Sequence, residues 1–147
     1  MAKGTVGAGV DTSLSLDDAG GGTLRIVQAD TTKVAINTKG HGLVDVTAMG
    51  DAGHSYASDE LEDCSFTAEL WFNDVATTGS WTVVDGLRTA TETASFEIHP
   101  FGDTVGYPEL TGECWLEDCN VDMTVADIVK LSASFKVHGA LTVGTAA

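Results

Sequence analysis

The stretch from Leu43 to Asp74 constrains the fold more than any other part of the chain. At its start, Val44 and Val46 alternate with other side chains between residues 43 and 47, which is typical of a half-buried strand. The alternation resumes with Phe66, Ala68, Leu70 and Phe72 on one face of a second strand. Residues 49–63 lie between the two, and a loop of that length in a small domain is usually functional or disordered. The pattern predicts strand, long polar loop, strand.

The long loop contains no nucleophile motif, phosphate-binding glycine pattern or metal-ligand spacing, so binding is the function that its residues favour. The alternative is a solvated hairpin arm with no partner. If the loop contacts a neighbouring subunit, the candidate residues are Met49, Asp51, His54, Tyr56, Asp59 and Glu60.

The chain is strongly acidic. Asp and Glu outnumber Lys and Arg 22 to 7, for a net charge of −15, and Arg88 is the one basic residue between Gly40 and Val129. Binding to nucleic acid requires clustered Lys and Arg that neutralise phosphates. The composition therefore argues against a nucleic-acid-binding protein and is also compatible with charge that serves solubility alone.

The rest of the chain reads as short strands with one helix. Strands are expected at 23–28, 33–37, 95–99, 111–123 and 131–137, and a helix is expected to begin at Ser80, as its cap, with Trp81, Val84 and Leu87 on one face. Short connections favour antiparallel pairing. The predicted fold class is mainly β: an antiparallel β-sandwich or partly closed barrel with one short helix and a long loop.

The predicted domain organisation is a flexible N-terminal arm (1–22), a single β domain (23–139) and a small-residue C-terminal tail (140–147) that follows Gly139. Residues 29–32 are expected to join two strands as a hairpin. Residues 124–127 are expected to form one helical turn.

The cysteines favour reduced thiols. Three is an odd number, and no apolar segment typical of a signal peptide follows Met1. Alternation in the strand at 111–123 places Cys114 on the face of Leu116 and Cys119 on the opposite face, so Cys119 is expected to be the most accessible. The longest apolar run is too short for a membrane span.

The residues contain no constellation that argues for catalysis, a cofactor or a metal. Cys114 and Cys119 lack the spacing of a zinc site. Asp59, Glu60, Glu62 and Asp63 could attract calcium by charge, but they lack the interleaved pattern of a dedicated loop. The chain is expected not to be an enzyme.

Several motifs resemble those of the tail tube (major tail) proteins of long-tailed bacteriophages. They are the residues V-T-A-M-G-D at 46–51, the acidic E-L-E-D at 60–63, S-F-T-A-E-L at 65–70, and G-Y-P followed by T-G-E at 106–113. Residues 125–139 resemble the final strand of that family, and the segment at Trp81 falls where the family has its helix. The match covers about Leu43 to Gly139; Glu60-Leu61 departs from a Gly-Leu pair common in the family, and the first forty residues show little resemblance.

The resemblance implies a structural virion protein, made in the host cytoplasm, that forms stacked six-membered rings in the phage tail. It implies contacts with itself and with other tail proteins (tape measure, terminator, baseplate), and a channel through which DNA passes without specific binding. Four acidic residues on polar strand faces are the candidates to line that channel: Glu69, Glu97, Glu113 and Glu117. No membrane partner is expected.

Two other classes remain open at this level. A carbohydrate- or cell-surface-binding β-sandwich would need an aromatic groove, for which Trp71, Trp81 and Trp115 are the candidates. A small enzyme on a β scaffold is the other class, and no residue pattern favours it.

Overall fold

The computed structural model of the chain describes residues 12–18, 23–27, 30–38, 43–58, 63–102 and 105–146. The elements are, in chain order, β1 (Ser13–Asp17), β2 (Leu24–Ile26), β3 (Thr31–Asn37), β4 (Leu43–Asp45), β5 (Tyr56–Ser58), β6 (Ser65–Trp71), α1 (Ser80–Arg88), β7 (Ala94–His99), β8 (Pro108–Asp122) and β9 (Lys130–Thr145). The prediction of a mainly β chain with one helix is confirmed.

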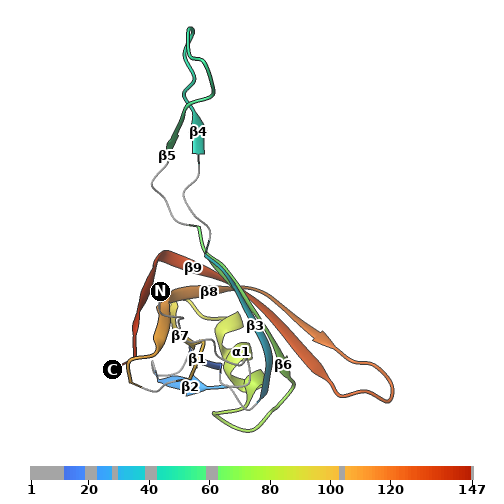
Figure 1. Cartoon of the computed structure of the whole chain (residues 1–147). Coiled ribbons are helices and arrows are strands. Elements are labelled where there is room, and N and C mark those ends of the chain that lie inside the picture. The colour runs from blue at the N-terminus through green and yellow to red at the C-terminus, as the bar shows by residue number, and fades with distance from the viewer. Residues whose placement is uncertain are drawn as a thin grey trace.

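Seven of the strands form one antiparallel sheet in the order β2-β1-β7-β8-β9-β6-β3. The sheet curls around α1 as a half-barrel (Figure 1). The other two strands, β4 and β5, pair only with each other and form a separate hairpin.

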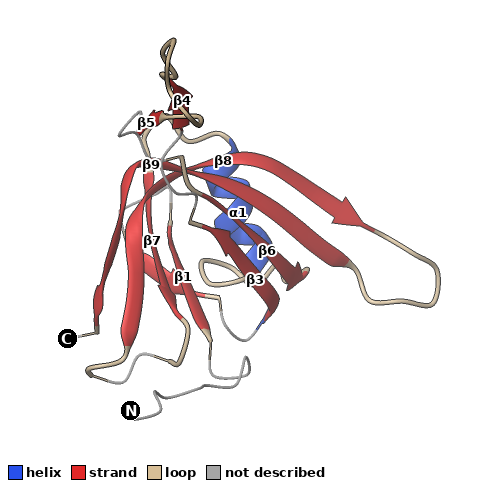
Figure 2. Cartoon of the chain, turned by 45° about the horizontal axis from the view of Figure 1, so that its top comes forward, coloured by secondary structure: helices blue, strands red, loops and turns tan. Residues whose placement is uncertain are grey.

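The long β8–β9 hairpin divides the large sheet into two halves, which Figure 2 shows as two legs that diverge from one bend. In the proximal half, β7 pairs with residues 110–114 of β8, and the pairing ends where Ala94 lies opposite Cys114. Strands β1 and β2 follow β7 in the sheet. In the distal half, β6 and β3 lie beside residues 130–136 of β9, whose partners on β6 run from Trp71 to Ser65. We use the names proximal half and distal half below.

The core lies between the curled sheet and α1. Three phenylalanines, one each from β6, β7 and β9, form its centre: the Phe66 ring lies 4.7 Å from that of Phe96 and 4.6 Å from that of Phe135. All three are at most 1% exposed. The apolar face of the helix (Val83, Val84 and Leu87) completes this cluster. The alternation predicted for residues 66–70 and 96–98 is therefore the core-facing pattern of β6 and β7.

The helix begins where the sequence predicts, but its cap differs. The N-cap residue is Gly79, and no side chain caps the helix. Ser80 lies inside the helix and is fully buried; its hydroxyl donates to the carbonyl of Trp71 and accepts from the amide of Asn73 (3.2 Å). A Cβ at position 79 would meet the Asn73 carbonyl oxygen at 2.4 Å, so a glycine is required there. Through these hydrogen bonds, Ser80 connects the end of β6 to the helix, and it does not cap the helix.

The N-terminal part of the chain differs from expectation. Residues 13–17, assigned to a flexible arm, form β1 between β2 and β7, with Leu14 and Leu16 fully buried. The predicted hairpin through residues 29–32 is also wrong, because β2 pairs with β1 whereas β3 pairs with β6 at the far edge. Strands β2 and β3 are consecutive in the chain and lie at opposite ends of the strand order of the sheet.

A bulge in β8 changes which side chains of that strand face the core, so the faces differ from the predicted ones beyond Leu116. Leu116 lies opposite Phe135, but Asp118, two residues later, lies opposite Ser134, the next residue of β9. Beyond this point the alternation is shifted by one residue, so Cys119 and Val121 pack against the core on the same side as Leu116. The prediction that Cys119 points away from the core is wrong for this reason.

The β9 strand also continues further than predicted. It runs through Gly139, which has a positive φ of 76°, to Thr145. Thr142 pairs with Thr111, and His138 pairs with Glu113, so β9 has two more residues than β8 between these two pairs. The register changes in the segment that contains Gly139, and the strand continues beyond it. Residues 140–145 are thus sheet and not a tail. Residues 125–127 form a turn between β8 and β9, with Ala126 at φ 65°, instead of the predicted helical turn.

Candidate assembly surfaces

The β4–β5 hairpin, residues 43–58, occupies the place of the predicted contact loop. Leu43 pairs with Ser58 and Asp45 with Tyr56. Every residue of the hairpin is exposed, so the prediction of a half-buried strand at 43–47 is wrong. Figure 1 shows the hairpin standing clear of the curled sheet, where its side chains have no core to cover.

Hydrogen bonds within the tip of this hairpin fix its shape. The Thr47 hydroxyl donates to Oδ1 of Asp45 and accepts from the amide of Ser55 (2.9 Å). The amide of Thr47 also donates to Oδ1 of Asp45 (2.9 Å), and Nδ1 of His54 lies 3.4 Å from the other carboxylate oxygen. These hydrogen bonds, those from Thr47 above all, hold the pKa of Asp45 below its usual range.

The T-A-M-G-D motif forms the turn at the end of the hairpin. The Asp51 carboxylate accepts from the amide of Ala48 (2.7 Å), and the Asp51 amide donates to the Ala48 carbonyl (3.2 Å). Gly50 has a φ of 92°, a conformation that L side chains rarely adopt. The turn leaves the Met49 side chain fully exposed.

Of the other predicted contact residues, His54 and Tyr56 lie on this hairpin, and two are not among the residues that the structure describes. Tyr56 is 57% exposed, and its ring centroid lies 6.3 Å from that of His54. Asp59 and Glu60 fall outside the described residues. The structure thus brings Met49, Asp51, His54 and Tyr56 together on one hairpin.

The four acidic residues predicted to line a channel fall on two parts of the sheet face that points away from the core. Glu69 and Glu117 are exposed and lie in the distal half. Glu97 and Glu113 lie in the proximal half and are partly buried; Glu113 accepts a hydrogen bond from the Ser95 hydroxyl (2.7 Å). The two pairs therefore occupy different surroundings.

A buried histidine lies beside Glu97. His99 is 5% exposed, its Nε2 lies 3.2 Å from Glu97 Oε2, and its Nδ1 lies 4.0 Å from Glu109 Oε2. The Nδ1 atom has no hydrogen-bond partner among the described residues. The three side chains line a cavity of about 530 Å³ together with Ser13 and Ser15.

Several edges of the large sheet have no strand partner among the described residues. Two are the ends of the sheet, the three-residue β2 and the seven-residue β3. Two others lie within the long hairpin. Residues 115–122 of β8 pair with β9 on one side, but β7 stops at Cys114 on the other. Residues 138–145 of β9 pair with β8 on one side, but the pairing with β6 stops at Lys136 on the other. Such edges are templates for pairing with another chain. The sequence did not identify the open edges of β8 and β9, because the places where β7 and β6 end relative to them depend on register.

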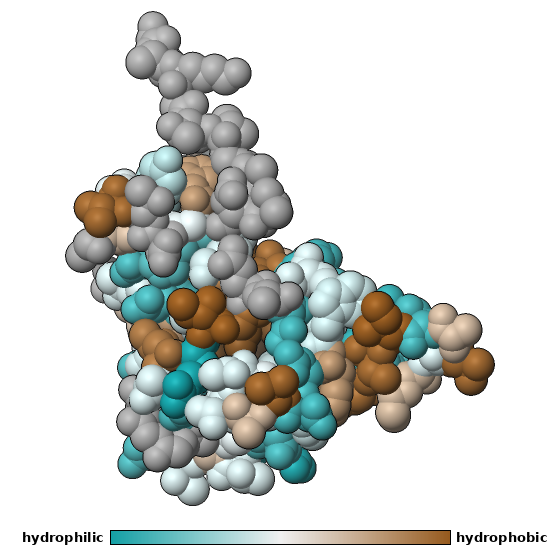
Figure 3. Space-filling model, turned by 90° about the horizontal axis from the view of Figure 1, so that it is seen from below, coloured by the Kyte–Doolittle hydropathy of each residue, from teal (hydrophilic) through white to brown (hydrophobic). Residues whose placement is uncertain are grey.

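A second feature missed by the sequence analysis is the apolar end of the β8–β9 hairpin. Met123, Val125 and Ile128 are 74%, 97% and 61% exposed. Figure 3 shows hydrophobic surface on this projecting end of the molecule. The signal was present as three apolar residues in six around a predicted turn.

Most basic side chains that the structure describes are paired with acids. Arg25 pairs with Asp18, Arg88 with Asp85, Lys130 with Asp127 and Lys136 with Asp63. Lys33, on edge strand β3, has no ion pair among the described residues. Asp118 and Asp122, at the open edge of β8, have none either within that part of the chain.

None of the three cysteines forms a disulfide: Cys64 and Cys114 are buried, and Cys119 is partly exposed. The prediction that Cys119 is the most accessible is confirmed, although it lies on the core side. Burial, helped by the nearby carboxylates of Glu113 and Asp17, raises the pKa of Cys114 to about 12. Burial and Asp118 also raise the pKa of Cys119.

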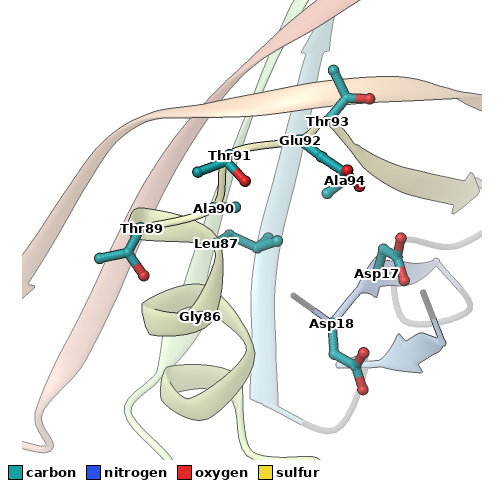
Figure 4. A pocket seen from close by; sticks show the side chains of 10 residues that line it. All are labelled: Asp17, Asp18, Gly86, Leu87, Thr89, Ala90, Thr91, Glu92, Thr93 and Ala94. Atoms are coloured by element: carbon teal, nitrogen blue, oxygen red, sulfur yellow. The ribbon is translucent and has the colours of Figure 1, made fainter. Parts of the chain in front are cut away.

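A second cavity lies beside the end of α1 and is lined mostly by small and acidic side chains. Its volume is about 390 Å³, and Asp17, Asp18, Gly86, Leu87 and residues 89–94 line it (Figure 4), where the side chains are threonines, apolar groups and carboxylates. Trp71, Trp81 and Trp115 line none of the described cavities. No group of three potential metal ligands occurs among the described residues, and no described helix is long and apolar enough to cross a membrane.

No protein-family model matches the sequence, and no curated protein sequence matches it. The fold does match solved structures. The tail of an empty gene transfer agent particle, with C6 symmetry, aligns at a TM-score of 0.77 and 15% identity over 95% of this chain and 99% of that one. A chain of the native gene transfer agent virion gives 0.72 and 16% over 95% and 99%. The SPP1 tail tube gives 0.71 and 12% over 95% and 80%. This chain therefore has the same fold as these tail structures.

Proposed function

We propose that this chain is a structural subunit of a phage-type tail tube, in which six copies form a ring and rings stack into a conduit for DNA. The observation that carries the proposal is the shared fold, which extends over 95% of this chain and 99% of a tail structure with C6 symmetry. The agreement covers the whole domain and not one motif. In the virion, the subunit would lie in the tail and perform no catalysis.

The open strand edges support a ring. A subunit with unpaired strands at two ends of a sheet can join its neighbours head to tail, and such a contact closes into a ring when the rotation between copies is right. Closure also covers edges that would otherwise invite aggregation. Six-fold closure is the symmetry of the matched tail.

The β4–β5 hairpin supports a contact between subunits. Its residues bury nothing in their own subunit, yet hydrogen bonds hold its tip in one shape, so little order has to be gained on binding. Met49 in the turn is the proposed apolar anchor, and His54 and Tyr56 are exposed on the same hairpin. Asp51 shapes the turn, and Asp59 and Glu60 belong to the same proposed contact segment.

The sheet face that points away from the core is the one available to line a channel, because α1 and the core cover the other. In the distal half this face carries four acidic residues (Glu69, Glu117, Asp118 and Asp122) and three lysines (Lys33, Lys130 and Lys136). Carboxylates there would oppose adsorption of phosphates, and DNA would pass without specific binding. Glu97 and Glu113 would serve the same role if the proximal half also faces the channel.

The proposed partners are other copies of this chain and the proteins at the two ends and inside of a tail, namely baseplate, terminator and tape measure. The two apolar projections suit such contacts: the β4–β5 hairpin and the end of the β8–β9 hairpin both present exposed hydrophobic side chains.

Electron microscopy of the purified protein tests this function. The charge of −15 per chain repels copies from one another, so the protein should be imaged across a range of salt concentrations, where screening weakens that repulsion. We expect tubes or rings with six-fold symmetry. Uniform monomers at every salt and protein concentration would count against the tail-tube assignment.

A further inference from the structure

We propose that the cavity around His99 is a binding pocket for a protonated alkylamine, supplied by a lysine of another copy of this chain or by a free amine. The pocket lies on the face of the proximal half that points away from the core. Cross-strand neighbours form it: Ser13 of β1 lies opposite His99 of β7, and Glu109 of β8 lies within 4.0 Å of the same ring. This inference goes beyond the proposed tube and does not depend on it.

The contact with Glu97 determines which ring nitrogen of His99 carries the proton. An ionised carboxylate only accepts hydrogen bonds, so Nε2, which lies 3.2 Å from Oε2 of Glu97, is the donor. The other nitrogen of a neutral imidazole is then an acceptor. Nδ1 of His99 is therefore an acceptor, and it has no hydrogen-bond partner among the described residues.

Glu109 places a second acceptor close to this nitrogen. Its Oε2 atom lies 4.0 Å from Nδ1 of His99, and the two atoms cannot bond to each other, since both accept. Two acceptors that each lie about 2.9 Å from one tetrahedral donor nitrogen are themselves roughly 4–5 Å apart. An ammonium nitrogen therefore fits between Nδ1 and Oε2 and can donate to both.

The acceptor on His99 is buried and held in place. The residue is 5% exposed, and a buried acceptor without a partner costs free energy that a donating ligand recovers. The end of β7 is fixed on both sides of the strand. The Thr12 hydroxyl donates to the Pro100 carbonyl (3.0 Å), and the Gly102 amide donates to the His99 carbonyl (3.2 Å). Because the ring is already positioned, little order has to be gained on binding.

The charges of the pocket favour a cation over a water molecule. The described residues that line the cavity include two carboxylates, Glu97 and Glu109, and no basic side chain. Both carboxylates are partly buried, and the attraction between opposite charges strengthens where water is excluded. A water molecule also donates two hydrogen bonds, but only a protonated amine adds this attraction.

The apolar part of the lining suits an alkyl chain. The cavity has a volume of about 530 Å³, which is far more than one water molecule needs. Leu24, Ile26 and Ala146 line it beside the polar groups. A lysine side chain packs its methylene groups on such a surface and keeps its charge among polar atoms. The pocket therefore matches both parts of an alkylammonium ion.

A metal ion suits the same residues less well. Glu97 and Glu109 lie at different ring nitrogens of His99, so one ion cannot bind the imidazole and both carboxylates together. In the part of the chain that the structure describes, no group of three potential metal ligands occurs. The two carboxylates have separate roles in the pocket: Glu97 orients the ring, and Glu109 binds the amine together with Nδ1.

Nuclear magnetic resonance of the histidine ring nitrogens tests the pocket directly. The chain has four histidines, and the spectrum of His99→Gln assigns the signals of His99. At about pH 8, an imidazole is ordinarily neutral and an alkylamine is protonated. We expect the ring proton of His99 on Nε2, and a saturable shift of Nδ1 on titration with n-butylammonium chloride. Tetramethylammonium chloride has the charge but no N–H donor, and it should not cause this shift.

A conservative variant locates the amine in the pocket. Glu109→Gln preserves the size of the side chain and removes its charge, so we expect n-butylammonium to bind about tenfold more weakly. Glu92→Gln is the matched control, because it makes the same change at an exposed position that lines a different cavity. Equal affinity of Glu109→Gln and wild type, a His99 ring protonated on Nδ1, or equal shifts with the two salts would each overturn the proposal.

Cross-linking distinguishes the two sources of the amine. A zero-length carbodiimide joins an amine to a carboxylate in contact with it, and a mixture of ¹⁵N-labelled and unlabelled protein identifies links between copies. Glu109 joined to a lysine of the other label would identify a neighbouring copy as the source. Binding of n-butylammonium in the assembled protein without such a link would identify a free amine, and either result supports the pocket. Protein that binds no amine in either state would overturn the pocket and leave the test of the tube by electron microscopy unaffected.

Discussion

The hydroxyl of Thr47 donates a hydrogen bond to Oδ1 of Asp45, and because it also accepts from the Ser55 amide, it ties the two sides of the β4–β5 hairpin together. Thr47→Val preserves the shape of the side chain and removes both bonds. We expect amide hydrogen exchange in residues 48–55 to accelerate about tenfold, the change that roughly 1.4 kcal/mol of lost hydrogen bonding gives. Exchange in β6 and β9 should not change. Thr67→Val, at an exposed position of β6, is the control.

Acid should open the same tip. Hydrogen bonds to its carboxylate lower the pKa of Asp45 in the folded hairpin, so the stabilisation is present above the ordinary aspartate pKa, about 3.9, and is lost as the pH falls through the lower folded value. We expect the amide shifts of Thr47 and Ser55 to be constant at neutral pH and to move only below about pH 4. In Asp45→Asn this titration should be absent. Movement that persists in Asp45→Asn would contradict the assignment of the titration to this carboxylate.

The burial of Leu14 predicts that residues 13–17 contribute to stability. Leu14 is fully buried between β2 and β7. Leu14→Ala should lower the free energy of unfolding by about 2–5 kcal/mol, measured by denaturant titration. Ile26→Ala, at a position 63% exposed, should change it by less than about 0.5 kcal/mol. Equal small effects would show that β1 is detached in solution.

These residues also show what the sequence could predict. Alternation identified the core faces of β6 and β7, because each of those strands is regular and buries one face completely. In β1 the pattern S-L-S-L-D is too short to signal a central strand, and small serines do not distinguish buried from exposed positions; here Ser13 and Ser15 are both buried.

Irregularities in the two longest strands account for the other differences. The bulge at Glu117 moves every later side chain of β8 to the other face, and a sequence pattern read with period two cannot show it. A glycine often marks the end of a strand, but Gly139 has a positive φ at a point where the register of β9 changes, and the strand continues beyond it. Of the contact surfaces, the β4–β5 hairpin was visible as a long loop with a turn motif, whereas the open edge of β8 depends on where β7 ends.

The thiols should react in a fixed order. Cys119 is partly exposed, whereas Cys64 and Cys114 are 2% and 1% exposed. We expect one thiol per chain to react in the native protein and three after unfolding, with or without prior reductant. Since the pKa of Cys119 is raised and the thiolate is the reactive form, its reaction should be slow at pH 7 and accelerate up to and beyond pH 9. The Cys119→Ser variant should lose the native reaction. A disulfide between Cys114 and Cys119 would contradict the β8 register.

The acidic residues of the sheet face separate the two ways in which the subunit can face a channel. Glu69→Lys with Glu117→Lys changes the distal half, and Glu97→Lys with Glu113→Lys changes the proximal half. If the distal half lines the conduit, tubes of the first variant should retain short DNA, and wild-type tubes should not. Each phosphate neutralised makes binding fall more steeply with salt, so retention measured from 50 to 200 mM salt should drop sharply. The second pair also removes the contacts of Glu97 with His99 and of Glu113 with Ser95, so its folding must be checked by thermal unfolding. DNA retained only by the second variant would place the proximal half at the channel.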